Sequence, residues 1–253
     1  MGTHVGGLIL PFQGNELQAV ALIEELEGKP LYKREQWTSD FNTGSEEDFS
    51  FYLVNGYLIL HHAGYVHSMF YTPEIWQEKF NQIGLMDRII VFLRVDSANT
   101  AGYAIYENAQ QIRCFEQADD ESYQSGVMLS FEQQWLNAPA FYIHEFEDEN
   151  GELQTRNISE SEFNEDEMEG WEEYYKCRYI EDYENSVHEF GLASVILNEL
   201  LFELFQTKYT LDDACPDEFL YRTLLEPRQK EQTRSKQDSK KSLWTKLTDL
   251  FKK

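Results

Sequence analysis

Cysteine is scarce in this chain of 253 residues, and its three cysteines, Cys114, Cys177 and Cys215, lie far apart. No two of them form a CxxC motif, so the sequence indicates neither a disulfide framework nor a zinc knuckle. Apolar runs are also short, and none approaches the roughly 20 residues that a helix needs to span a bilayer. Because the first residues show no signal-peptide pattern either, we expect a cytoplasmic protein without disulfides.

The motifs of common enzyme classes are missing as well. The sequence contains no GxGxxG, GxxxxGK[ST], GxSxG or HExxH pattern. His61, His62 and His67 are close in sequence, but no ligand spacing supports a metal site there. We therefore expect no catalytic residue, no cofactor and no metal. The alternative is an enzyme of unrecognised type that uses His61, His67 or His144 with nearby carboxylates.

Basic residues are few, and this imbalance is the strongest compositional signal. The chain has 21 Lys and Arg against 46 Asp and Glu, a net charge of −25 at pH 7. Residues 223–253 hold nine basic and four acidic residues, so the first 222 residues carry a net charge of −30. Such a surface repels nucleic acid and anionic lipid and attracts basic partners. We expect a basic protein partner, not nucleic acid or a membrane, although an acidic surface can also serve solubility alone.

The chain does contain, from Phe49 to Glu116, a series of short apolar strands joined by turn signals. Asn55-Gly56 separates two apolar runs and tolerates the positive φ angles of a type I′ hairpin turn. The runs RIIVFLRV, GYAIYE and QQIRCFEQ follow, and residues 63–71 (AGYVHSMFY) suggest a further strand. The predicted fold class is α+β, an antiparallel meander sheet of about five strands packed against two to four helices.

Three helices have start signals in the sequence. Asn15 is a cap residue before a stripe formed by Leu17, Val20, Ala21, Ile23 and Leu26. Thr72-Pro73 begins a second helix with Ile75, Trp76, Phe80 and Ile83 on one side and Gly84 at its end. Residues 186–189 match a Ser-x-x-Glu capping box and predict that a long apolar helix starts there. Residues 125–135 are expected to form a strand that leads into a turn at residues 137–139, and residues 219–225 (FLYRTLL) to form a last strand or a helical turn.

Residues 145–184 hold sixteen acidic residues and three basic ones, with few β-branched residues, which predicts an acidic loop. Aromatic residues interrupt its second part. Such rings supply much of the binding energy of interfaces, although more often they pin a segment onto a core. We predict that a partner binds there, through Glu165, Asp166, Glu167, Glu169, Trp171, Glu172, Glu173, Tyr174, Tyr175 and Tyr179.

We divide the chain into one acidic domain at 1–226, a flexible linker at 227–241 and an amphipathic basic helix at 242–253. The apolar face of that helix comprises Leu243, Trp244, Leu247, Leu250 and Phe251. A helix this short is marginal in water, so it needs a surface. We expect it to dock on the acidic domain or to join two copies as a homo-oligomer, rather than to bind a membrane or a partner groove.

Several stretches resemble one uncharacterised bacterial family, a domain of unknown function. They are DSANTAGYAIYENAQQIRCF, the segment around VMLSFEQQW, SVHEFGLASVILNELLFELF and CPDEFLYRTL, in an order that resembles the family across roughly Asp87 to Leu225. The resemblance implies no activity, and the acidic segment and the basic tail depart from it.

Together these features favour a non-enzymatic cytoplasmic binding protein with an acidic aromatic surface. In a bacterium, an immunity protein that neutralises a basic toxin fits best, because it needs a stable scaffold and no catalytic residues. The alternatives are the histidine-based enzyme and a peripheral membrane or scaffold protein held by its C-terminal helix.

Overall fold

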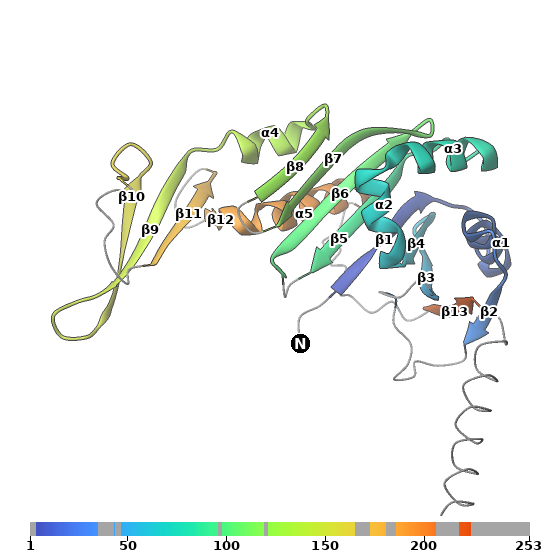
Figure 1. The fold of residues 1–253 in the computed structure, drawn as a ribbon, viewed down its shortest axis with the longest axis horizontal. Helices are drawn as coiled ribbons and strands as arrows, with labels where there is room; N and C mark the ends of the chain where they lie inside the picture. The colour runs from blue at the N-terminus through green and yellow to red at the C-terminus, as the bar shows by residue number, and fades with distance from the viewer. Residues whose placement is uncertain are drawn as a thin grey trace, which may run out of the picture.

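A computed structural model describes most of the chain, in the ranges 4–34, 43, 47–95, 98–118, 121–164, 173–180, 186–205 and 218–223. Among these residues it has five α-helices and two antiparallel sheets, which confirms the mixed α+β class (Figure 1). Residues 227–253, with the predicted linker and tail helix, lie outside the described residues. They include Leu243, Trp244, Leu247, Leu250 and Phe251. The division at residue 226 therefore stays a prediction.

The larger sheet has nine strands in the order β2-β13-β3-β4-β1-β5-β6-β7-β8. Asn55 and Gly56, with φ angles of 49° and 82°, form the predicted turn between β3 and β4. The simple meander is confirmed only from β5 to β7, because β1 lies between β4 and β5, and β8 extends it by a strand that was not predicted. The strands are β1 (His4–Pro11), β2 (Leu31–Arg34), β3 (Asp48–Val54), β4 (Tyr57–His61), β5 (Ile89–Val95), β6 (Thr100–Glu107), β7 (Gln110–Ala118), β8 (Glu121–Gly126) and β13 (Phe219–Thr223).

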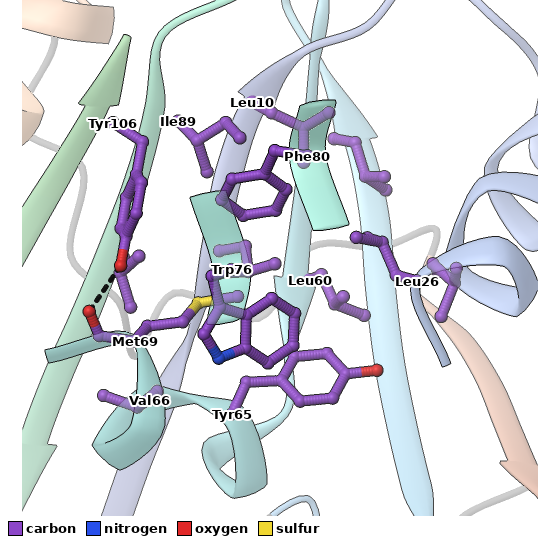
Figure 2. Close-up of a cluster of buried hydrophobic side chains, with 14 of the residues drawn as sticks. Leu10, Leu26, Leu60, Tyr65, Val66, Met69, Trp76, Phe80, Ile89 and Tyr106 are labelled. Carbon is purple, nitrogen blue, oxygen red and sulfur yellow. Dashed lines mark hydrogen bonds between the residues drawn. The ribbon is translucent and has the colours of Figure 1, made fainter. Parts of the chain in front are cut away.

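Helices cover both faces of this sheet. Side chains of a strand point alternately to its two faces, so Leu8 and Leu10 of β1 face one cluster and Ile9 faces the other. The first cluster packs under α1 (Glu16–Glu27), α2 (Val66–Tyr71) and α3 (Pro73–Ile83), and Figure 2 shows its centre, around Trp76 and Phe80. The second cluster packs against α4 (Ser130–Leu136) and α5 (Leu192–Phe205). We call this sheet with its five helices the body.

The local helix signals are largely confirmed. Asn15 accepts a hydrogen bond from the backbone N–H of Gln18 at 3.1 Å and caps α1 as predicted. Pro73 begins α3 and Gly84 ends it with a φ of 71°. Three expected members of the apolar stripes are wrong, because Leu17 is 75% exposed, Ile75 is 62% exposed and Ala21 is exposed as well.

Three predicted elements are wrong. Residues 63–71 form a 3₁₀ turn, η1 (Ala63–Tyr65), and helix α2, because the i, i+3, i+4 spacing of Val66, Met69 and Phe70 buries one helical face. Residues 130–135 of the expected strand are helical in α4. The capping box at 186–189 does not open the long helix. Its first three residues form β12 (Ser186–His188), a 3₁₀ turn η5 (Glu189–Gly191) follows, and α5 begins at Leu192.

A second, four-stranded sheet has the order β10-β9-β11-β12, with β9 (Ala140–Glu147), β10 (Leu153–Ser159) and β11 (Glu173–Tyr179). Figure 1 shows these strands projecting from the α4 and α5 end of the body, away from α1 and α3. We call this sheet the arm. The acidic loop expected over residues 145–184 is wrong for the described part, because β9 pairs with both β10 and β11 there. No described helix has the length and the apolar character to cross a membrane.

Candidate functional site

The arm holds the described part of the predicted partner surface. Glu173, Tyr174, Tyr175 and Tyr179 all lie in β11, next to β9 in the middle of the sheet. The other predicted members lie outside the described residues, namely Glu165, Asp166, Glu167, Glu169, Trp171 and Glu172. The segment from Glu173 to Tyr179 is therefore a paired strand rather than a loop.

A cluster of rings covers one face of the arm. Tyr142, His144 and Phe146 alternate along β9 and so share a face, and the register places Tyr174 of β11 opposite His144. His144 stacks on Tyr174 with ring centroids 4.3 Å apart, and Tyr142 stacks on Phe163, from the segment after β10, at 3.4 Å. Phe163 also meets Tyr174 edge to face at 5.8 Å. We call these five residues the ring cluster, and all five are half-buried.

The turn between β9 and β10 explains how an acidic stretch folds as a hairpin. Asp148 accepts hydrogen bonds from the backbone N–H groups of Asn150 at 2.8 Å and Glu152 at 3.0 Å. These bonds, the one from Glu152 first, lower the pKa of Asp148 because they stabilise the carboxylate. Gly151 completes the turn with a φ of 77°. One acidic residue of this stretch thus has a structural role in the turn.

Basic side chains neutralise little of the arm's charge. Residues 140–188 hold sixteen acidic residues, and their three basic residues are Arg156, Lys176 and Arg178. Lys176 pairs with Glu160 at 3.2 Å, and Arg178 pairs with Glu189 at 2.8 Å. Glu145, Glu147, Glu149 and Glu152 make no ion pair with a described residue. The arm therefore combines an aromatic face with uncompensated negative charge.

Arg178 also anchors the arm to the body. Its Nη1 donates hydrogen bonds to the backbone oxygens of Leu136 at 2.9 Å and Ala138 at 3.0 Å, at the end of α4. Its Nε and Nη2 donate to the two carboxylate oxygens of Glu189, just before α5. A guanidinium suits this position because its fixed donors can bind a carboxylate and two carbonyls at once.

The three histidines of the enzyme alternative do not come together. His61 lies on β4 with its Nε2 2.8 Å from the Tyr52 hydroxyl, and burial lowers the pKa of His61 to about 4. His67 lies on α2, where its ring is 4.8 Å from that of Tyr71, and His144 lies in the arm. His62 faces the other side of the sheet from His61 and stacks on Phe49 at 4.0 Å. No described group of three or more His, Cys, Asp or Glu residues is placed to hold a metal.

The body has a surface recess of about 480 Å³ beside the start of α1. Its lining is mostly uncharged, and Asp87 is the titratable side chain in it. The remaining lining residues are Pro11, Phe12, Gln13, Gly14 and Gln18. A single carboxylate without a base, nucleophile or cation beside it gives this recess no recognisable chemistry.

Four members of the ring cluster, Tyr142, His144, Phe146 and Phe163, are absent from the predicted partner surface. A signal for the first three exists in the sequence, because FYIHEFE places a ring at every second position, 142, 144 and 146, which is the spacing of one face of a strand. The stacking of Tyr142 on Phe163 has no local sequence signal, since it depends on the path of the chain after β10.

Comparison of this chain with protein-family models, with curated proteins and with solved structures gives no match. The resemblance to an uncharacterised bacterial family therefore stays an expectation. The functional argument rests on the arm's chemistry.

Proposed function

We propose that this chain is a non-enzymatic binding protein whose arm engages a basic protein. The ring cluster in an acidic sheet, outside the helix-covered body, is the observation that carries the proposal. Rings that are half-buried can add contact area without a large entropic cost, since an aromatic side chain has few rotatable bonds. In a bacterium, a basic toxin is the partner class that fits, and the chain would act as its immunity protein.

The charge of the arm supports a partner of opposite sign. Uncompensated carboxylates raise the rate at which a basic protein meets the surface, and this steering weakens as salt screens it. The rings would then hold the complex together, because residues at the centre of an interface carry most of the binding energy. Removing one ring should thus cost more affinity than removing one exposed glutamate.

Retention on the immobilised full-length chain tests this proposal. The chain is incubated with a lysate of its source organism at low and at high salt, and the retained proteins are identified by mass spectrometry. We expect a basic protein to be retained at low salt by the wild type and by the body variant Tyr32→Ala, since Tyr32 is exposed on β2. The Tyr174→Ala variant should not retain this protein, and the Glu147→Gln variant should retain a smaller amount of it than the wild type does.

The immunity role has its own readout. Expression of the retained protein alone should stop growth, and co-expression with the wild-type chain, but not with the Tyr174→Ala variant, should restore it. Equal retention by Tyr174→Ala and wild type, with both folded, would remove the ring cluster from the interface. A retained protein that is harmless alone would contradict the immunity role and leave the binding role standing.

A further inference from the structure

The described sheets end in four edge strands, and these edges differ in charge. Unpaired backbone groups make an edge strand a template for another strand, and proteins commonly protect edges with Lys, Arg, Pro or short length. β2 has four residues, of which Lys33 and Arg34 are basic, β10 carries Arg156 in its middle, and β12 has three residues. β8 has six residues, with Glu121 at its first position and no Lys, Arg or Pro. β8 is therefore the least protected edge.

β8 is also open to solvent. All of its residues except Ser125 are exposed, Tyr123 is 41% exposed, and Val127 just after the strand is 80% exposed. The ten residues from Ser122 to Phe131 carry no charge, in a chain with a net charge of −25. Figure 1 shows β8 as the last strand at its end of the nine-stranded sheet. An exposed, uncharged strand edge of this kind is typical of an interface.

We propose that β8 pairs antiparallel with β8 of a second copy of this chain, joining two nine-stranded sheets into one. A closed two-fold dimer requires a residue near the middle of the strand to lie opposite its own copy. With Tyr123 at that position, Glu121 lies opposite Ser125 of the second copy. Tyr71 of α2 already packs on Tyr123 with ring centroids 5.3 Å apart, so the two copies would bring four tyrosines together on one face. This inference concerns the body and goes beyond the arm's proposed function.

The charge pattern selects β8 over the β2 and β10 edges for pairing with a second copy. Two chains of net charge −25 repel each other, so they can join only where like charges do not meet. In the proposed register the two Glu121 residues lie at opposite ends of the strand pair, about 14 Å apart, beyond the Debye length of about 8 Å in physiological salt. Self-pairing of β10 about its centre would instead place Arg156 opposite Arg156, and self-pairing of β2 would bring Lys33 and Arg34 close to their copies.

A charge swap at Tyr123 tests this pairing. The molar mass of the full-length chain is measured by analytical ultracentrifugation over a concentration series. We expect the wild type to approach twice the 29.9 kDa of one chain. Tyr123→Lys and Tyr123→Glu each place like charges across the two-fold axis, and each should weaken the dimer at least about tenfold. An equimolar mixture of the two variants should recover the dimer, because Lys then faces Glu.

The mixture separates a broken interface from a misfolded chain, since a misfolded variant would not recover. Tyr32→Lys, on the opposite edge of the same sheet, is the matched control and should leave the dimer intact. A wild-type chain that stays at 29.9 kDa at all concentrations would overturn the proposal, and so would a dimer that persists in both Tyr123 variants. In either case the β8 edge would be left for a strand of another protein or for solvent.

Discussion

The body and the arm bury their apolar residues in different ways. The body sandwiches its sheet between two layers of helices, and side chains such as Phe80 and Phe92 are fully buried. In the described part of the arm, Phe141 and Cys177 are the buried apolar residues, and the ring cluster remains half-buried. The body therefore has the burial that stabilises a fold, whereas the arm keeps apolar surface available for contact.

The two regions are joined by polar contacts as well as by chain connections. Gln117 of β7 donates from Nε2 to the backbone oxygen of Glu189, which directly follows β12 of the arm, at 2.5 Å. Arg178 adds its bonds to the end of α4. These contacts fix where the arm leaves the body, so a rigid body can hold the arm in a defined position for a partner.

Truncating a buried ring of the body should give the largest loss of stability. Phe80 is fully buried, and its ring lies 5.9 Å from Trp76 and 5.3 Å from Tyr106 (Figure 2). Phe80→Ala should lower the free energy of unfolding by about 3–5 kcal/mol, because it removes transfer energy and leaves a cavity. Urea unfolding followed by tryptophan fluorescence measures this, and a loss below about 1 kcal/mol would contradict the body's assigned role.

The ion pairs of the two regions offer a second contrast. In the body, Arg113 and Glu132 are both buried, with the Arg113 Nε 2.8 Å from the Glu132 Oε1. Arg113→Met should lower the free energy of unfolding by about 3–5 kcal/mol, because it leaves the buried Glu132 carboxylate without a partner. Lys176→Met, in the more exposed pair of the arm, should lower it by about 0–1 kcal/mol. The double variant Arg113→Met/Glu132→Leu should regain much of the loss. Equal losses in the free energy of unfolding for Arg113→Met and Lys176→Met, measured by urea unfolding, would contradict this difference between body and arm.

The body should also respond to pH through His61. The pKa of His61 is lowered to about 4 from an ordinary 6.5, so the unfolded chain binds a proton there that the folded chain does not. Protonation of His61 therefore does not affect the free energy of unfolding above pH 6.5. As pH falls from 6.5 to 4, it lowers that free energy by about 1–3 kcal/mol. His61→Phe should flatten this part of the stability profile relative to wild type, and His67→Phe, at an exposed position, should not. Identical profiles for wild type and His61→Phe would contradict the assignment.

Truncating a ring of the arm should cost much less stability than truncating a ring of the body. Phe163 contacts Tyr142 and Tyr174 but remains half-exposed, so Phe163→Ala should lower the free energy of unfolding by about 1 kcal/mol or less. The same variant should still lose the retained basic protein. A stability loss as large as that of Phe80→Ala would show that the ring cluster is a structural core, the more common role of aromatic residues.

Features with local signals could be predicted from the sequence. The Asn55-Gly56 turn, the Asn15 cap and the Pro73 and Gly84 boundaries depend on backbone preferences of a few residues. The helical spacing of Val66, Met69 and Phe70 was also available, but β-prone composition favoured a strand there. The segment folds as a helix because that face is buried against the sheet.

Features that depend on distant segments could not be predicted. β13 lies between β2 and β3, where Arg222 pairs with Asp48 across 174 positions of sequence. Ser186 pairs with Tyr179 of β11, and this ladder overrides the capping signal. The ring cluster likewise requires the register that sets Tyr174 opposite His144. The composition of residues 145–184 shows that the segment is acidic and aromatic. Which of its rings share a face depends on the pairing between strands.

Hydrogen exchange of the full-length chain, with and without the retained basic protein, tests the division between body and arm most directly. The free chain should exchange slowly in peptides that cover β1 and β5 and faster in peptides that cover β9 and β11, because the arm buries less. Addition of the basic protein should slow exchange in β9 and β11 and leave β1 and β5 unchanged. Slower exchange confined to the body, with the arm unaffected, would contradict the account.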